Sequence, residues 1–280
     1  MSKRIVNISS DSRYFSRLLN LIGSIRKTND KLIFVEVWDL GLSKIQKEIL
    51  NKMDVTVNRI DDFYEKWSDC YAWKIYVYKH SAGDVFFHLD AGNIVFSDVH
   101  HIFDLIEKDG FFLVDQGQRL EDITPKAYMN KYGGSNLDPD YEVFAAGNIG
   151  LNKKCPEIKA AIDDAYLAAS NGACMGYSFS ERNRDKKGSN IIHDCKLFRH
   201  DQTLFNVILR KHCSNLYIHR HENYAALKLS PESCIVNKRT YAYRNLIDVD
   251  LGFLLFPVIF YCFFSDIKIR AVNYISRRFK

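Results

Sequence analysis

Apolar and polar positions along the first ninety residues alternate between two patterns, one typical of strands and one typical of helices. Short runs of β-branched residues are each followed by a segment with apolar residues three or four positions apart, which is typical of βαβ units and a largely parallel sheet. The polar cluster Ser9–Asp11 favours a helix start, and the helix that follows has an apolar face of Phe15, Leu18, Leu19, Ile22 and Ile25. We expect strands at Arg4–Ile8, Leu32–Val37, Val55–Val57 and Val85–Leu89, and further helices at Leu42–Leu50 and Tyr71–Tyr78.

The next part of the chain continues this alternation with two interruptions. Gln116–Asp140 loses its periodicity and Gly176–Asn190 is polar, so we expect both to be loops, the first a long one over the ligand site. The predicted fold class is α/β, a mixed and mostly parallel sheet flanked by helices. Its later elements are expected to be helices at His101–Lys108, Ile158–Ala169 and Thr203–Arg210, and strands at Phe111–Val114 and Leu216–His219.

The last thirty residues differ in kind from the rest. Leu251–Phe264 is an apolar run of 14 residues that contains Pro257. It is shorter than the ~20 residues that a membrane-spanning helix needs, and we expect Pro257 to interrupt it, so we expect it not to span. We predict a catalytic domain at 1–244 and a membrane-associating amphipathic tail at 245–280, and the alternative is a last core helix with a solvated basic end. Beyond the apolar run, apolar residues recur at every fourth position: Ile267, Ala271, Ile275 and Phe279.

The charge distribution argues against nucleic acid as a partner. The chain of 280 residues has a formal net charge of +5, from 39 Lys and Arg against 34 Asp and Glu. The last thirty residues hold five basic side chains and one acidic one, which leaves only +1 for the first 250 residues. A nearly neutral body lacks the phosphate-neutralising charge from which duplex affinity comes. The basic tail favours the anionic surface of a membrane instead.

The cysteines and the amino terminus predict a cytosolic location. The seven cysteines include no CxxC pair and are odd in number, which is typical of reduced thiols in a cytosolic compartment. The amino terminus lacks the apolar core of a secretion signal. We therefore expect a peripheral protein on the cytoplasmic side of the cell membrane.

Two aspartates follow apolar strands at positions where α/β sheets bind ligands. Asp11 and Asp90 come directly after predicted strands, and the ligand crevice of an open α/β sheet lies beyond the carboxyl ends of its strands. A carboxylate delivered by an apolar strand can coordinate Mg²⁺ or Mn²⁺ together with the phosphates of a substrate. The alternative is a turn aspartate that caps the backbone.

The segment around Asp90 resembles a motif of glycosyltransferase family 8. The family has a GT-A fold, and its hallmark is an apolar strand that ends in Asp-x-Asp and is followed by a helix. In HLDAGNIVFSDVHHIF the second Asp is replaced by Gly92, which puts metal use in doubt. Ala145 likewise stands where the family has Asn, with Asn148 as a substitute. Further segments resemble the family in the same order: Ser9–Tyr14, Tyr71–Lys74, Phe144–Asn148, Asp201–Asn206 and Leu216–His219.

The resemblance implies a role for each matching residue, and each has an ordinary alternative. Asp11 and Tyr14 would hold the nucleobase, or else serve as a helix cap and a core aromatic residue. Lys74 would neutralise phosphate, or else be a solvated helix lysine. The donor site would also include Asp90, Gly92 and Asn148. Asp201 and Gln202 would face the anomeric carbon, or else cap a helix, and His219 would join Asp90 as a ligand of Mn²⁺ or Mg²⁺, or else lie in the core.

These residues predict a nucleotide-sugar-dependent glycosyltransferase. The resemblance implies a UDP-linked donor, a membrane-associated glycan or lipid-linked acceptor in surface polysaccharide or lipopolysaccharide synthesis, and retention of anomeric configuration. A catalytically inactive, membrane-tethered scaffold of the same fold is the alternative. Nucleotidyl transfer would require a first loop rich in Gly and Arg, and SSDSRYFSR lacks the glycines. The sequence contains no GxGxxG, Walker, HExxH or GxSxG pattern, which argues against several other enzyme classes.

Overall fold

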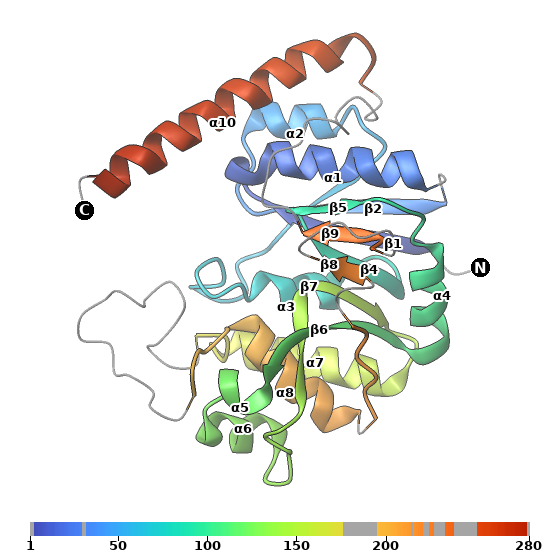
Figure 1. Ribbon diagram of the computed structural model, residues 1–280, viewed down its shortest axis with the longest axis vertical. Helices are drawn as coiled ribbons and strands as arrows, with labels where there is room; N and C mark the ends of the chain where they lie inside the picture. Colours follow the sequence, from blue (N-terminus) through green and yellow to red (C-terminus); the bar gives the residue numbers. More distant parts are fainter. Residues whose placement is uncertain are drawn as a thin grey trace. The chain divides into compact units, whose positions relative to one another are not determined.

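The computed structural model describes residues 3–29, 32–175, 195–213, 215–220, 224–226, 233–237 and 251–278. The chain divides into two compact units (Figure 1). We call Ile60–His88 with His101–His221 the central unit, and Lys3–Arg59 with Leu89–His100 and Glu222–Lys280 the terminal unit. β4 (Val85–Asp90) begins in the central unit and ends in the terminal unit.

The terminal unit is built on three parallel strands. β1 (Arg4–Ser10) pairs with β2 (Ile33–Asp39), and β2 pairs with β3 (Thr56–Arg59). α1 (Phe15–Thr28) buries all five apolar residues that the sequence predicts for its core face. A small second sheet has the strand order β5-β9-β8. The other elements of this unit are η1 (Ser12–Tyr14), α2 (Lys44–Leu50), β5 (Asn93–Val95), β8 (Ala225–Ala226), β9 (Ile235–Asn237), η4 (Gly252–Leu254) and α10 (Leu255–Arg278).

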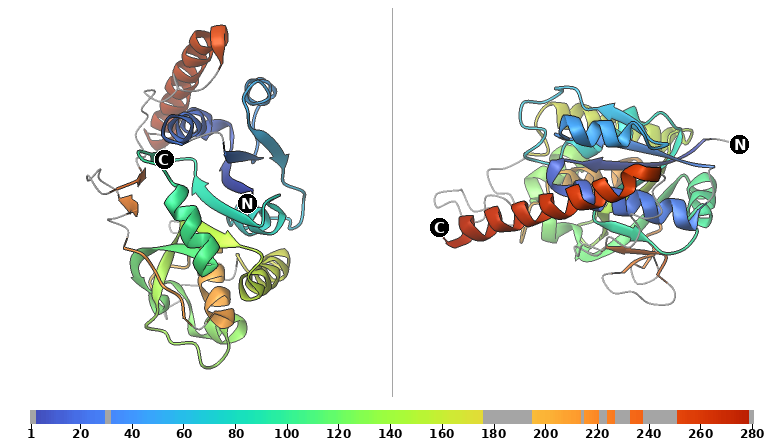
Figure 2. Two further views of the ribbon diagram at one scale, coloured as in Figure 1. Left: turned by 90° about the vertical axis from the view of Figure 1, so that its right-hand side faces the viewer. Right: turned by 90° about the horizontal axis from the view of Figure 1, so that it is seen from above.

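α10 corrects the expectation that Pro257 interrupts the apolar run. Pro257 lies in the first turn of this 24-residue helix, where a missing backbone N–H breaks no intrahelical hydrogen bond. The apolar segment was also expected to be too short for a membrane-spanning helix. This is wrong, because the 21 residues Gly252–Val272 are helical and apolar enough to cross a membrane by length and composition. Figure 2 shows α10 crossing over α1.

The central unit combines a mixed sheet with packed helices. β4 lies beside β7 (Glu142–Asn152), which pairs in antiparallel fashion with β6 (Phe111–Arg119). The β6–β7 register shifts on both sides of Asp115, which lies opposite Phe144. The helices are α3 (Trp73–His80), α4 (His100–Asp109, of which His100 belongs to the terminal unit), α5 (Leu120–Ile123), α6 (Lys126–Gly133), α7 (Pro156–Ser170) and α8 (Asp201–His212).

The predicted fold class is confirmed, and two local predictions need correction. A mixed, mostly parallel sheet flanked by helices is present. Gln116–Asp140 is not a structureless loop, because β6 continues into it and α5 and α6 follow. Leu216–His219 is not a strand but meets β6 at one parallel bridge, from Val114 to His219. The predicted loop at Gly176–Asn190 and the predicted domain boundary after residue 244 lie outside the described residues.

Candidate functional site

The middle of β7 is the meeting point of residues from α3 and α8 in the central unit. Lys74, in the first turn of α3, is only 6% exposed. Its Nζ donates a hydrogen bond of 3.1 Å to the backbone oxygen of Ala146 and lies 5.4 Å from the Trp73 ring centroid. Lys74 is therefore not the solvated lysine of the alternative reading. A buried ammonium group attracts negative charge strongly because little water screens it, which makes this a place where a phosphate would be stabilised.

Gln202 and Asn206 hold the same stretch of β7 from α8. Phe144 lies where the β6–β7 register shifts, and side chains of α8 form hydrogen bonds with both of its backbone groups. The Phe144 oxygen accepts from Gln202 Nε2 at 2.9 Å and from Asn206 Nδ2 at 3.1 Å. The Phe144 N–H donates to Asn206 Oδ1 at 3.0 Å. Since the Gln202 amide nitrogen faces this carbonyl, the Gln202 carbonyl oxygen is directed elsewhere.

The start of α8 is strained, and the same strain recurs before α3. His200 and Tyr71 are the two non-glycine residues in the described part of the chain with positive φ, 52° and 56°, and their ring centroids are 5.8 Å apart. Such backbone conformations cost about 1–3 kcal/mol each and concentrate at functional sites. Asp201 does not have the helix-capping role that was its alternative, because His200 is the N-cap residue and buried Asp201 is the first residue of the helix.

Other groups around the α8 start are polar and buried. His200 Nδ1 lies 2.8 Å from the Cys174 oxygen. Burial raises the pKa of the Cys174 thiol well above its usual range, and its hydrogen bond with Cys70 and the carboxylate of Asp201 add to the shift. Asn148 is 4% exposed, and its Oδ1 has no hydrogen-bond partner among the described residues. A buried acceptor without a partner costs about 1–3 kcal/mol, so this oxygen is placed to accept from a ligand.

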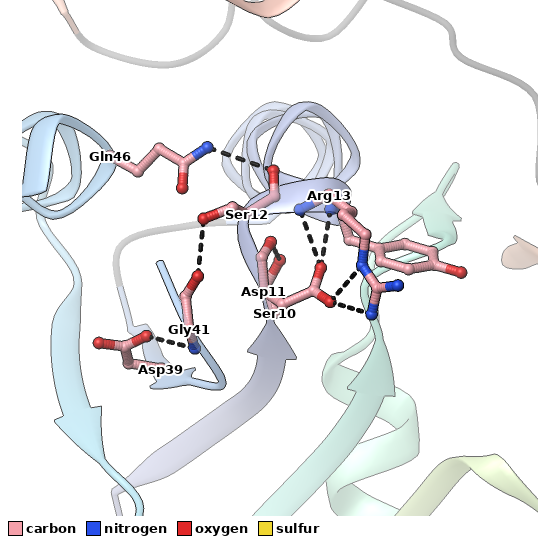
Figure 3. Close-up of polar contacts among 8 residues, drawn as sticks. Ser10, Asp11, Ser12, Arg13, Asp39, Gly41 and Gln46 are labelled. Carbon is pink, nitrogen blue, oxygen red and sulfur yellow. Dashed lines mark hydrogen bonds and ion pairs between the residues drawn. The ribbon is translucent and has the colours of Figure 1, made fainter. Parts of the chain in front are cut away.

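In the terminal unit, the turn after β1 holds Asp11 in a closed set of hydrogen bonds (Figure 3). Asp11 Oδ1 accepts from the backbone N–H groups of Arg13 and Tyr14 at 2.9 and 3.2 Å. Asp11 Oδ2 accepts from Arg13 Nε and Nη2 at 2.8 and 2.6 Å. The four acceptor positions of the carboxylate are thus engaged, so a base N–H would have to displace Arg13. These contacts match the alternative role of Asp11 as a helix cap.

The other residues of the terminal unit that are predicted to bind the nucleotide-sugar lie at or beside the ends of helices and strands. The Tyr14 ring is 45% exposed, which is not a core position, and the Arg17 guanidinium lies 4.8 Å from its centroid. Asp90 is the last residue of β4, and Gly92 follows in the turn before β5. The roles predicted for Tyr14, Asp90 and Gly92 in donor binding stay predictions.

His219 has contacts typical of a packed residue. Its ring stacks on Phe112, with centroids 4.8 Å apart, and meets Tyr217 edge-on at 4.7 Å. Burial lowers the pKa of His219, against a smaller opposing effect of Asp109. No group of three or more His, Cys, Asp or Glu side chains suited to a metal ion occurs in the part of the chain that the structure describes. The roles predicted for Asp90 and His219 in binding Mn²⁺ or Mg²⁺ stay predictions.

Two hollows of the central unit were not predicted from the sequence, and Glu142 lines both. The first, which we call the acidic hollow, has a volume of about 630 Å³ and pairs each of its three basic side chains with a carboxylate. The second, the arginine hollow, has a volume of about 410 Å³ and is lined by Tyr141, Arg210 and residues 215–218. The charged residues of the acidic hollow are Asp115, Glu121, Asp122, Asp140, Glu142, Arg119, Lys196 and Arg220.

Sequence reasoning did not assign a site role to Asn206, His200 or Arg210. Asn206 was part of a family-like segment, and this was the only signal for it. The positive φ of His200 has no sequence signature, since the residue is not glycine. Arg210 is in the last turn of α8, where a basic residue is ordinarily a solvated partner of the helix dipole.

Comparison with known proteins identifies the fold. No protein-family model and no curated protein sequence matches the chain. The chain is similar to the apo structure of the bifunctional glycosyltransferase WbbM, with a TM-score of 0.55 and 14% identity over 92% of this chain and 51% of that one. This chain thus spans about half the length of WbbM.

A second solved structure is matched over most of both chains. It is the galactosyltransferase LgtC in complex with donor and acceptor sugar analogues, with a TM-score of 0.52 and 10% identity over 84% of this chain and 87% of that one. At such identities the likeness concerns the fold, and it confirms the architecture that the family-like segments implied. The chain has the GT-A fold of these glycosyltransferases.

Proposed function

We propose that the chain transfers a sugar from a UDP-linked nucleotide-sugar to a membrane-associated glycan or lipid-linked acceptor. The observation that carries the proposal is the convergence of three family-like segments on the middle of β7. Lys74 binds the Ala146 oxygen, and Gln202 and Asn206 both bind the Phe144 oxygen. Glycosyl transfer needs a positive group that stabilises the leaving diphosphate and polar oxygens that stabilise the anomeric carbon, and both are present at this short stretch of strand.

The chemistry follows from the two ends of the bond that breaks. As the sugar leaves its diphosphate, negative charge grows on the leaving oxygen and the anomeric carbon becomes oxocarbenium-like. Lys74, buried and already desolvated, stabilises the diphosphate. The Gln202 carbonyl oxygen and the Asp201 carboxylate stabilise the positive anomeric carbon. Asn148 Oδ1, a buried acceptor, takes a hydrogen bond from a donor hydroxyl. Transfer is proposed to retain anomeric configuration, as in the family that the sequence resembles.

A divalent metal would supply further charge for the leaving diphosphate. Asp90 is the carboxylate that the family motif assigns to it, and His219 is the second ligand that the resemblance implies. Lys74 fulfils part of the same role without a metal. We therefore expect donor hydrolysis to depend less on Mn²⁺ than on Lys74.

Substitution of Lys74 tests the proposal. Hydrolysis of UDP-, GDP- and CMP-sugars is measured with and without Mn²⁺, and Lys74→Met should lower kcat/KM for the active donor by about a hundredfold or more. Lys79→Met is the matched control, because Lys79 is on the same helix but pairs with Asp163 at 2.6 Å. If no donor is hydrolysed and no nucleotide raises the melting temperature, the inactive scaffold is the better proposal.

The surface of α10 supports a proposed peripheral location on the cytoplasmic side of the membrane. One stripe of the helix packs into the terminal unit: Val258, Cys262 and Asp266 are buried, and Asp266 Oδ1 accepts a 3.0 Å hydrogen bond from Ser16. Because the first half of α10 is anchored on the terminal unit in this way, we propose that the helix lies in the plane of the membrane. The opposite stripe is apolar and exposed, and it consists of Phe256, Phe260, Phe263, Phe264 and Ile267.

Liposome flotation tests this location. The full chain should float with vesicles of phosphatidylcholine and phosphatidylglycerol, and the combined change Phe256→Ser, Phe260→Ser and Phe264→Ser should weaken binding by at least about tenfold. Leu167→Ser removes a similarly exposed apolar side chain from α7 and should leave binding unchanged. Equal flotation of the triple variant and the wild type would contradict the proposed membrane contact.

A further inference from the structure

Arg210 is buried, and no carboxylate of the described residues forms an ion pair with it. Lys74 and Arg210 are the two Lys or Arg residues that are buried in the described part of the chain, and Arg210 is 8% exposed. An Nη2–H of Arg210 donates to the backbone oxygen of Glu142, and the guanidinium lies 4.1 Å from the Tyr141 ring centroid. Its Nε has no hydrogen-bond partner among the described residues.

This arrangement leaves a positive charge unbalanced. Burial lowers the pKa of Arg210, and the charges of Tyr141, Glu142 and Asp138 offset this only in part. Breaking up a buried ion pair by removing one partner usually costs several kcal/mol, so an uncompensated guanidinium is destabilising unless an anion binds it. A planar guanidinium binds carboxylate and phosphate groups through paired hydrogen bonds.

The hollow in front of Arg210 has the features of a sugar-binding surface. Tyr217 lines the arginine hollow and is 67% exposed, so its ring offers an apolar face. Glu142 is also on the wall, but its carboxylate lies 3.6 Å from Arg220 of the neighbouring acidic hollow. The volume of about 410 Å³ is in the range of sites for small ligands.

The two hollows differ in charge and share a wall. In the acidic hollow five acidic side chains face three basic ones, so it disfavours an anion and suits the neutral hydroxyl groups of a saccharide. Asp115 of that hollow lies opposite Phe144, the residue that Gln202 binds. A saccharide that reaches from the Gln202 side across Glu142 would therefore meet the guanidinium of Arg210 with its more distant unit.

We infer that the arginine hollow binds an anionic group of the acceptor glycan, a carboxylate or phosphate on a sugar unit beyond the one that receives the new bond. Arg210 binds the anion, and Tyr217 packs against the sugar ring. The identification of the bound molecule as the acceptor rests on the proposed function. The anion site itself depends only on the arginine hollow. It makes the acceptor an acidic glycan.

Ligand-observed NMR with the full chain tests the anion site. The probes are D-glucuronate, D-glucose 6-phosphate and uncharged D-glucose. At least one of the two anionic sugars should bind more tightly than glucose, and which of them binds more tightly identifies the anion as carboxylate or phosphate. Arg210→Met should weaken that binding by about tenfold or more, because it removes a charge-assisted hydrogen bond.

Three further variants make the outcome decisive. Lys211→Met removes the same charge from the adjacent, exposed position of α8 and should change binding by less than about twofold. Arg210→Lys keeps the charge, and Tyr217→Ala alters an exposed side chain, so both test the site if Arg210→Met fails to fold. Both should weaken binding of the anionic sugars.

The inference is overturned if glucose binds as tightly as both anionic sugars, or if the Arg210 variants bind like Lys211→Met. Donor hydrolysis by the wild-type chain is measured separately. Arg210-dependent binding without donor hydrolysis would leave the anion site standing and refute the proposed transfer. Donor hydrolysis without Arg210-dependent binding would support the proposed transfer and refute the anion site.

Discussion

Asn206 permits a prediction whose size follows from three hydrogen bonds. Asn206→Ala removes the acceptor of the Phe144 N–H at 3.0 Å, and the donors to the Phe144 and Gln202 oxygens at 3.1 and 2.9 Å. The Phe144 oxygen keeps its bond from Gln202, but the N–H is left buried without a partner. The orphaned donor costs about 1–3 kcal/mol and each of the two lost Nδ2 hydrogen bonds about 1 kcal/mol, so the free energy of unfolding should fall by about 3–5 kcal/mol.

Gln202→Ala should behave differently on its own. The Phe144 oxygen would still accept from Asn206, so the free energy of unfolding should fall by only about 1 kcal/mol. Turnover should fall severely, because the carbonyl oxygen proposed to face the anomeric carbon is lost. In the double variant both backbone groups of Phe144 lose their side-chain partners, and the loss of stability should exceed the sum of the single losses by at least about 1 kcal/mol.

Urea unfolding followed by circular dichroism measures all three variants against the wild type. The reasoning is refuted if Asn206→Ala lowers the free energy of unfolding by less than about 1 kcal/mol, or if the two single effects add within about 0.5 kcal/mol. Either result would mean that β7 satisfies its backbone at Phe144 without α8.

Two further predictions concern packing and charge. Gly150→Ala should lower the free energy of unfolding by about 1–3 kcal/mol in the same urea assay, because the added Cβ would lie 2.3 Å from Cδ1 of Ile106; an unchanged midpoint would contradict this. Asp164 has its pKa lowered by hydrogen bonds from Lys211 and His212, so its stabilising effect is present above the unfolded-state pKa and is lost as the pH falls through the lower folded-state pKa. Asp164→Asn should therefore cost less than about 1 kcal/mol at pH 7 and nothing in strong acid, and a penalty that grows with acidification would exclude this account.

The sequence predicts most regular elements because they have a strong local pattern. The five apolar positions of α1 recur at helical spacing, and all of them are buried. α5 and α6 were missed because their few apolar residues are buried by partners distant in the chain. Leu120 and Met129 pack with Val143 of β7 and Val207 of α8, and such contacts leave no periodicity in a short segment.

The candidate site was predictable only through the resemblance. Nothing in the local pattern around Lys74 distinguishes it from a solvated lysine, yet its ammonium group is buried against β7. The contacts of Gln202 with Phe144 depend on a register shift between two strands, which no spacing in the sequence predicts. Arg210 was missed because its burial depends on Tyr141, which is distant in the sequence and lies directly before β7.

The ring contact between Tyr71 and His200 joins the beginnings of α3 and α8. Each backbone is kept in an unfavourable conformation by its surroundings, so neither helix start can relax without moving the ring of the other. Lys74 and Gln202, which lie far apart in the sequence, are thereby kept at a fixed separation. A sugar diphosphate would meet both side chains already in position, and little ordering entropy would be lost on binding.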